Sequence, residues 1–156
     1  DIQKSFVAVH NQPGLYVGQQ ARFGGKVINV INGKTDTLLE IAVLPLDSYA
    51  KPDIEANYQG RLLARQSGFL DPVNYRNHFV TILGTIQGEQ PGFINKVPYN
   101  FLEVNMQGIQ VWHLREVVNT TYNLWDYGYG AFWPEPGWGA PYCTNAVSQV
   151  TPELVK

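Results

Sequence analysis

The sequence has few cysteines, few charged residues and no long apolar run. Its single cysteine, Cys143, excludes an internal disulfide and any zinc site built from several cysteines. No apolar run approaches the roughly 18 residues of a membrane-spanning helix, and no secretory signal pattern is present. Charged residues make up 15% of the chain, against roughly 25% in an average soluble domain. Because the net charge is −2 and the eleven Lys and Arg residues are scattered singly, the sequence disfavours nucleic acid as a partner.

The chain is long enough to bury one hydrophobic core. At 156 residues it falls within the size of one domain, and 44% of the residues are hydrophobic. We predict a single domain over residues 1–156. Within it we expect a lead-in over residues 1–20, a barrel over residues 21–114, and an aromatic segment with a C-terminal tail over residues 115–156 packed on that barrel.

The region from 21 to 44 organises this prediction as a β-hairpin. Two runs rich in β-branched residues flank Asn32-Gly33, a pair that favours a two-residue type I′ turn. Gly24-Gly25 interrupts the first run, and glycine inside a strand usually marks a bulge or a sharp bend. A strongly coiled first strand is what a small closed barrel needs.

Further strands follow the hairpin. They are predicted at residues 61–66, 78–88, 101–105 and 109–114, with the last two forming either one bent strand or a pair. Within the polar stretch 47–58, Pro52 favours the start of a short helix, and residues 88–92 read as a turn. We expect a polar tail over residues 144–156, with a helical turn after Thr151-Pro152. The predicted fold is all-β: a five- to six-stranded OB-like barrel with one short helical connection and an irregular C-terminal segment rich in aromatics, Gly and Pro.

The aromatic segment covers residues 122–142 and contains eight aromatic residues among many Gly and Pro. So many helix and strand breakers argue against regular structure. Its rings would either fold back as a lid on the barrel or form a surface for a partner. If the segment binds a ligand, Tyr129, Trp133 and Trp138 are the predicted binding residues.

No motif in the sequence names a reaction. His10, His78 and His113 are isolated, so a histidine metal site is less expected than histidines bonded to backbone or water. No Gly-x-Ser-x-Gly elbow accompanies the serines. Glu40 and Glu103 fall on predicted strands as a conceivable acid–base pair, although solvated strand faces explain them more simply. We therefore predict no catalytic residues, no metal and no cofactor.

Several sequence blocks resemble a known family. They are Val17-Gly18, the run at 21–27 (ARFGGKV), the block at 75–78 (YRNH) leading into 80–84, and Val111-Trp112. Together they resemble the Slp family of bacterial outer-membrane lipoproteins over nearly the whole chain. The resemblance implies an envelope protein associated with starvation or stationary-phase stress. It also implies a signal peptide and an acylated N-terminal cysteine, neither of which is among these residues, and it supplies no catalytic residues.

Taken together, the resemblance and the residues predict a non-enzymatic protein held at the bacterial outer membrane by a lipid anchor. It would serve as a structural or binding module of the cell envelope under stress, with an envelope protein or glycan as partner. The alternative is a glycan- or peptide-binding OB module that uses the aromatic segment as its stacking platform. The sequence does not fix the oligomeric state.

Overall fold

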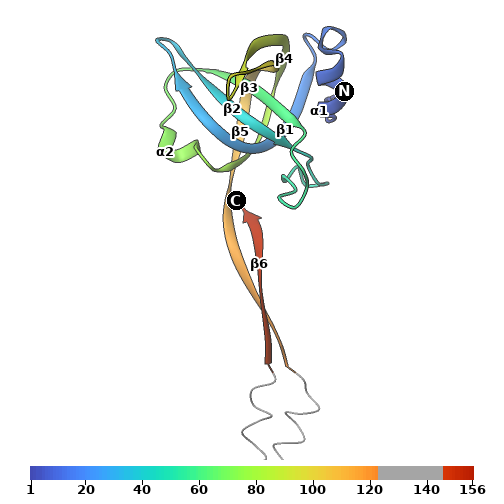
Figure 1. The fold of residues 1–156 in the computed structure, drawn as a ribbon, viewed down its shortest axis with the longest axis vertical. Coiled ribbons are helices and arrows are strands. Elements are labelled where there is room, and N and C mark those ends of the chain that lie inside the picture. Colours follow the sequence, from blue (N-terminus) through green and yellow to red (C-terminus); the bar gives the residue numbers. More distant parts are fainter. Residues whose placement is uncertain (123–145) are drawn as a thin grey trace, which may run out of the picture. The chain divides into compact units, whose positions relative to one another are not determined.

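The computed structural model describes residues 1–122 and 146–156 (Figure 1). The chain forms two compact units. The first unit comprises residues 1–113 and 154–156, and the second comprises residues 114–153. No helix in the described part of the chain is long and apolar enough to cross a membrane.

The described chain is mostly β-structure. Its helices are α1 (Phe6–Asn11), the 3-10 turn η1 (Pro13–Leu15) and α2 (Pro72–Tyr75). Its strands are β1 (Gln20–Asn32), β2 (Asp36–Leu44), β3 (Gly60–Ser67), β4 (Phe79–Ile94), β5 (Val97–Tyr122) and β6 (Ala146–Val155). The predicted predominance of strands is confirmed, and the six strands fall within the predicted range.

The strands form one sheet in the order β3-β2-β1-β4-β5-β6. The pairings among β1 to β5 are antiparallel except one, a parallel pairing of β3 with β5 that runs from Leu62↔Leu102 to Arg65↔Asn105. This pairing joins the two ends of the five-strand row, so β1 to β5 form a near-closed ring. In the second unit, the C-terminal part of β5 lies beside β6 (Figure 1).

Strand β1 is shared around the ring. Residues 20–26 pair with β4, and residues 24–32 pair with β2. Only at 24–26 do both neighbours flank the strand, and there Gly24 and Gly25 leave room for them. A Cβ on Gly24 would lie 2.5 Å from the carbonyl oxygen of Val80, and one on Gly25 would overlap the carbonyl oxygen of Ala42. The glycines therefore permit close backbone approach. The bulge expected there lies further along, between Val27 and Asn29.

The hairpin formed by β1 and β2 is confirmed, but the predicted type I′ turn is wrong. Asn32 pairs with Thr37, three residues (33–35) lie between the two strands, and neither Asn32 nor Gly33 has positive φ. The two-residue turn with positive φ lies instead between β4 and β5, at Asn95 (φ 48°) and Lys96 (φ 71°). In the first hairpin, the Gly33 N–H donates to the carbonyl oxygen of Asp36 and stabilises the longer loop.

The helix predicted within residues 47–58 is also wrong. The side chain of Asp47 accepts hydrogen bonds from the N–H groups of Tyr49 and Lys51, and Asp53 accepts one from Glu55. Such short-range bonds satisfy the backbone in turns and compete with a helix. The short helical connection is α2, between β3 and β4, where Asp71 caps the N-terminus and Pro72 occupies the first turn.

Two further boundaries differ from prediction. The turn expected at residues 88–92 is part of β4, where Pro91 is tolerated because β4 pairs there with β5 alone. For residues 101–105 and 109–114, the alternative of one bent strand is confirmed, with a register shift at Gln107. The helical turn expected after Thr151-Pro152 is replaced by β6. Strand β4, between β1 and β5, is central as predicted.

The hydrophobic core fills the interior of the ring. Its largest fully buried side chains come from α1 and from each strand of the ring: Phe6, Val9, Phe23, Val27, Leu39, Ile41, Val43, Leu62, Ile82, Ile86 and Leu102. The α1 helix covers one end of the ring, where Phe6 packs edge-on against Phe23 at 5.6 Å. The Ser5 side chain caps the start of this helix. The ring is therefore filled by side chains.

The close approach at Gly25 predicts a steep effect of substitution. In Gly25→Ala the new methyl group meets the Ala42 carbonyl oxygen, so β1 and β2 must separate. We expect the free energy of unfolding to fall by about 2–4 kcal/mol, measured by urea denaturation. The control is Gly108→Ala, a glycine that also lies within a strand, β5. Its methyl group meets nothing within 4 Å, so the free energy of unfolding should change by less than about 1 kcal/mol. Equal effects at both positions would contradict this account.

Candidate functional site

A groove crosses the outer face of β1, β4 and β5 beneath the loop that joins β2 to β3. Its volume is about 490 Å³, with strand residues such as Arg22, Leu83 and Gln110 on one side and loop residues 48–50 on the other. Smaller hollows continue it at both ends. One reaches Lys4 and Asp47, and the other reaches Lys51 and Lys156. These hollows share lining residues with the central groove, so the three are adjacent, and together we call them the loop groove.

The loop is held over the strands by a chain of buried hydrogen bonds. The indole N–H of Trp112 donates to the Thr81 hydroxyl at 3.0 Å, and that hydroxyl donates to the carbonyl oxygen of Ala50. Trp112 is 5% exposed and Thr81 is 8% exposed. Nearby, Gly24 leaves space for the side chain of Leu46 on the same outer face. The wall of the loop groove is therefore a packed structure with its polar atoms satisfied.

Positive charge predominates in the loop groove. Lys4, Arg22, Lys51 and Lys156 line it, and the Lys51 ammonium lies 5.4 Å from the centre of the Trp112 ring. Asp47 is the one side-chain carboxylate among the lining residues of these hollows, and it already accepts the two backbone N–H groups of its own turn. Within the described residues, none of the four cations lies in a salt bridge. The arrangement suits an anion.

The aromatic side chain at the rim is Tyr49, which is 83% exposed. Its backbone is fixed by the Asp47 turn, so the ring is presented to solvent from an ordered position next to the cations. An exposed ring of this kind provides an apolar face for a ligand. The loop groove thus combines charged groups that attract an anion with a flat surface that packs against a ring.

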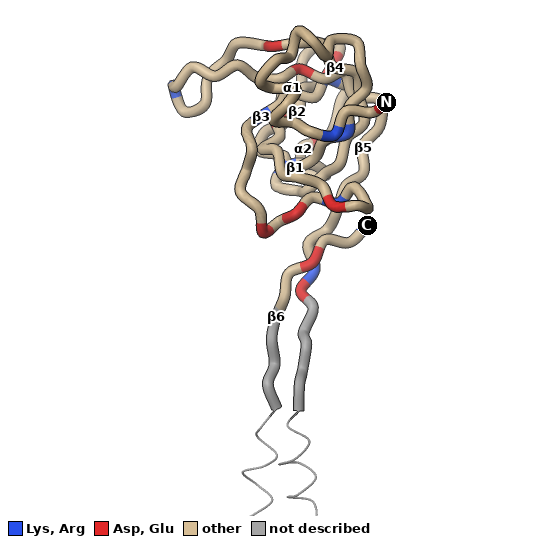
Figure 2. Tube along the Cα trace, turned by 90° about the vertical axis from the view of Figure 1, so that its right-hand side faces the viewer, with Lys and Arg blue, Asp and Glu red and all other residues tan. Residues whose placement is uncertain are grey.

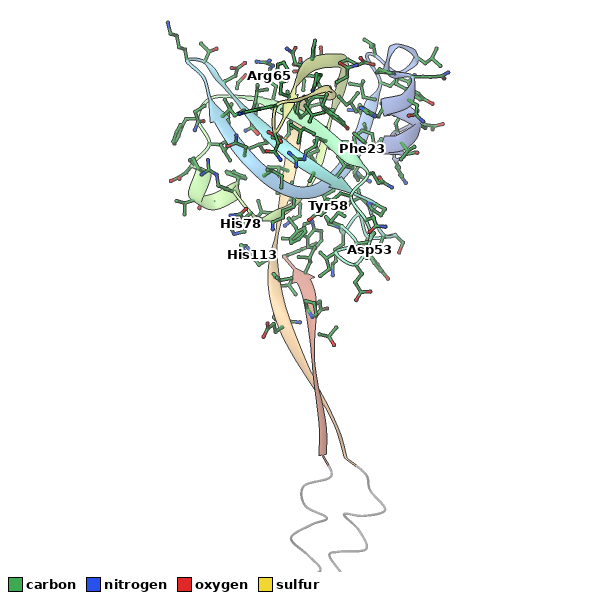
Figure 3. All side chains as sticks on the ribbon, in the orientation of Figure 1. Phe23, Asp53, Tyr58, Arg65, His78 and His113 are labelled. Atoms are coloured by element: carbon green, nitrogen blue, oxygen red, sulfur yellow. The ribbon has the colours of Figure 1, made fainter. Side chains whose placement is uncertain are left out.

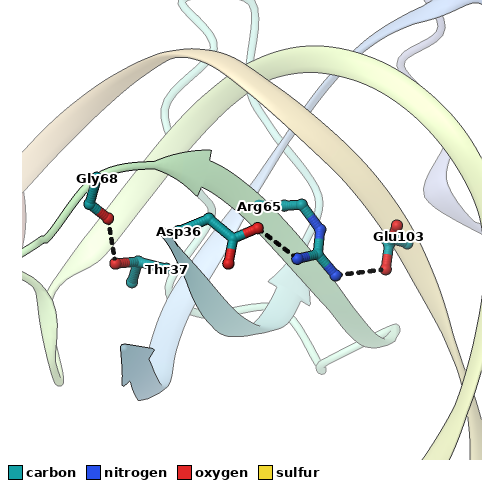
Figure 4. Close-up of polar contacts among 5 residues, drawn as sticks. All are labelled: Asp36, Thr37, Arg65, Gly68 and Glu103. Atoms are coloured by element: carbon teal, nitrogen blue, oxygen red, sulfur yellow. Dashed lines mark hydrogen bonds and ion pairs between the residues drawn. The ribbon is translucent and has the colours of Figure 1, made fainter. Parts of the chain in front are cut away.

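A second polar cluster lies across β2, β3 and β5, and here the charges are paired. The guanidinium of Arg65 donates to Asp36 at 2.6 Å and to Glu103 at 3.4 Å (Figure 4). These contacts raise the pKa of Arg65 above its ordinary value, the hydrogen bond to Asp36 contributing most. Beside them, Thr37 is buried and donates to the carbonyl oxygen of Gly68 at 2.7 Å. The charged groups are engaged with one another, so little is left for a ligand.

Glu40 and Glu103, considered above as an acid–base pair, lie on this cluster. They are separated by Leu63 of β3, which pairs with both of them. Glu40 bonds to Arg61, and Glu103 bonds to Arg65. Two strand spacings put the backbones roughly 10 Å apart, and each carboxylate is held by its own arginine. The structure therefore favours the simpler interpretation of charged residues on an outer strand face.

The three histidines do not meet. His10 stacks between Phe6 and Tyr99, and its Nε2 lies 2.9 Å from the carbonyl oxygen of Asn100. His78 and His113 contact each other edge-on at 5.6 Å (Figure 3), and His78 Nδ1 lies 3.2 Å from a backbone carbonyl oxygen. Within the described residues, no three His, Cys, Asp or Glu side chains gather as metal ligands.

The predicted binding residues Tyr129, Trp133 and Trp138 lie outside the described residues, as does Cys143. The loop groove was not predicted from the sequence. Charged residues are sparse along the traced chain (Figure 2), and the groove cations come from four separate segments that only the fold brings together. The sequence offers one local signal for this site. Asp47 stands two residues before Tyr49, and an aspartate at this spacing is typical of a turn that exposes the residues after it.

Comparison with known proteins shows the relationships of the chain. The outer membrane lipoprotein Slp family matches residues 1–143. The chain is 99% identical over 156 residues to outer membrane protein Slp of Escherichia coli K12, covering all of this chain and 83% of that protein. It is 42% identical to the uncharacterized lipoprotein YeaY of the same organism, over 96% of this chain and 80% of that protein. An uncharacterized protein of Haemophilus influenzae is 29% identical, over 85% of this chain and 69% of its own length. No solved structure matches the chain.

The hydrogen-bond chain at Trp112 generates a prediction. Thr81→Val keeps the side-chain volume but leaves the Trp112 indole N–H and the Ala50 carbonyl oxygen without a partner. We expect the free energy of unfolding to fall by about 1–3 kcal/mol in urea denaturation, the usual penalty for buried unpaired polar groups. As the matched control, Thr85→Val on the same strand removes only an exposed bond from Gln107 and should cost less than about 0.5 kcal/mol. A neutral Thr81→Val would show that the loop is held by packing alone.

Proposed function

Given that the chain belongs to the Slp family of outer membrane lipoproteins, we propose that it acts at that membrane as a non-enzymatic binding module. Its ligand is an anionic saccharide of the cell envelope, bound in the loop groove. The carrying observation is that Lys4, Arg22 and Lys51 line the loop groove without salt bridges among the described residues. The lipid anchor and the association with starvation stress belong to the same proposal.

The pairing order supports an OB-type assignment for the ring. In the order β1-β2-β3-β5-β4, a parallel β3–β5 pairing closes the row, and α2 connects β3 to β4. OB folds commonly bind oligonucleotides or oligosaccharides over strands 2 and 3. In this chain, the outer face of β2 and β3 carries the paired charges of Arg61 and Arg65. The cations that form no salt bridge within the described residues lie over β1, β4 and β5, which favours the loop groove as the binding surface of a single OB-type domain.

An anionic saccharide fits the loop groove better than a nucleic acid does. The net charge of −2 gives no long-range attraction for nucleic acid. Arg22 offers a planar fork for a carboxylate or phosphate, and the exposed Tyr49 ring offers a flat apolar face on which the C–H face of a sugar can pack. The ligand class is therefore a sugar that carries a carboxylate or a phosphate.

The side chains that would serve in catalysis are engaged elsewhere. His10 is stacked between two aromatic rings, and Glu40 and Glu103 are each bonded to an arginine. The lining of the loop groove contains no histidine within the described residues. A site of fixed cations with an aromatic rim supports binding without bond cleavage.

The aromatic segment is a second candidate surface. Residues 122–142 contain eight aromatic residues, among them Tyr129, Trp133 and Trp138. We propose them as stacking positions for a glycan or peptide, with a lid on the ring as the competing role. The two surfaces are distinguished by mutation, because the loop groove depends on cations and the aromatic segment depends on rings.

A ligand series on one sugar ring tests the proposal. We expect N-acetylmuramic acid or N-acetylglucosamine 1-phosphate, but not neutral N-acetylglucosamine, to bind saturably in isothermal titration calorimetry. Arg22→Gln with Lys51→Gln should weaken binding by about tenfold or more, since hydrogen bonds to charged groups contribute about 1.5–3 kcal/mol each.

The matched control changes charge equally but away from the groove. Lys34→Gln with Arg76→Gln also removes one lysine and one arginine that lie outside the groove lining, and it should leave affinity within about twofold. Equal losses in both double variants would mean that binding follows net charge. Binding lost instead in Trp133→Ala with Trp138→Ala would move the site to the aromatic segment.

A further inference from the structure

The hairpin that joins β4 to β5 ends in an exposed apolar tip, residues 91–98. Phe93 is 69% exposed and Val97 is 63% exposed. The register pairs Phe93 with Pro98 and Ile94 with Val97. Directly paired residues point to the same face of a ribbon, and successive pairs point to opposite faces. Both faces of the tip are therefore apolar.

This tip extends past the neighbouring strands. β1 pairs with β4 only as far as Thr85, and β3 pairs with β5 only from Leu102 onward. Within the described chain, residues 88–94 of β4 pair only with β5. Gly92 of the tip lies against the buried Phe101 ring, but Phe93 and Val97 remain exposed, so these two side chains need another explanation than packing within the ring.

The base of the hairpin is firmly held. The Tyr99 hydroxyl accepts a hydrogen bond from the Arg61 N–H at 3.0 Å, and the Tyr99 ring stacks on His10 at 5.5 Å. His10 also contacts the Asn100 carbonyl oxygen. The two-residue turn at Asn95 and Lys96 closes the other end. A tip on such a fixed base is presented in one conformation, which lowers the entropic cost of inserting it into another phase.

We propose that residues 91–98 insert into the interfacial region of a lipid bilayer. Three observations favour a bilayer over a protein partner. The chain belongs to a family of outer membrane lipoproteins, so a bilayer is its established surroundings. Apolar side chains on both faces suit a medium that surrounds the tip, whereas a docking strand needs only one apolar face. The one charge between Gln90 and Asn100 is Lys96, which can reach anionic headgroups while its stem remains among acyl chains.

This insertion is separate from ligand binding in the loop groove. The tip contributes no residue to the groove lining. It would add a second point of contact with the bilayer beside a lipid anchor. It would also orient the ring at the membrane surface.

Vesicle flotation of the chain tests the insertion. Vesicles of phosphatidylethanolamine and phosphatidylglycerol at 3:1 should carry the wild-type chain. Phe93→Ser with Val97→Ser should lower its partition coefficient by at least tenfold, since loss of each buried apolar side chain weakens partitioning by about that factor. Lys96→Glu should weaken binding to these vesicles and leave binding to neutral phosphatidylcholine vesicles unchanged.

The chain offers a matched control, Phe69→Ser with Val73→Ser. These residues are equally apolar and are 72% and 79% exposed, but they lie next to and on α2. The control should float like wild type, and thermal melting followed by circular dichroism should show all variants folded. A wild-type chain that does not float, or equal losses in both double variants, would overturn the proposal. Self-association that disappears in the Phe93/Val97 variant, seen by sedimentation, would assign the tip to a second copy and also overturn it.

Discussion

The close approach of three backbones at Gly24 and Gly25 is the constraint on which the ring depends. Strand β1 must pair with β2 and β4 at the same residues, and a side chain at Gly25 would overlap the Ala42 carbonyl oxygen. Because β1 pairs with both strands here, the sheet can curve around its hydrophobic core. The same absence of a side chain at Gly24 lets Leu46 settle on the outer face. The position of the β2–β3 loop, and with it the loop groove, therefore follows from two residues that contribute no side chain.

The small number of charges is divided between two surfaces with different consequences. Over β2, β3 and β5, arginine and carboxylate groups are paired, as at Arg65, and partly exposed pairs of this kind contribute little to stability. Over β1 and β4, Arg22 and Lys51 lack such partners within the described residues. A ligand that binds the second surface meets charges that need not first be separated from one another. This difference gives a chain with 15% charged residues a preferred anion-binding surface.

Sequence periodicity predicted the strands well because each alternates between a core face and an outer face. It located β1 to β5, but it misplaced features that depend on competing local bonds. Where a helix was expected, Asp47 instead bonds to the backbone of a turn. The two-residue turn with positive φ occurs at Asn95-Lys96, a pair that indicates such a turn less strongly than Asn32-Gly33 does. The loop groove could not be predicted, because its cations come from distant segments. The tip of the β4–β5 hairpin was not predicted. Pro91 indicates a turn as long as the strand pairing around it is unknown.

The parallel pairing of β3 with β5 has a consequence for how fast the ring forms. Leu62 and Leu102 pair although they lie forty residues apart along the chain (102 minus 62). The contacts that close the ring therefore join residues far apart in the sequence. Closing so long a loop costs conformational entropy before the stabilising contacts can form. Until then, β3 and the start of β5 each expose an unpaired edge, which is the property that leads strands to pair between chains. A chain that folds in the crowded cell envelope is most exposed to aggregation in this interval, after the β1–β2 hairpin has formed and before the ring has closed.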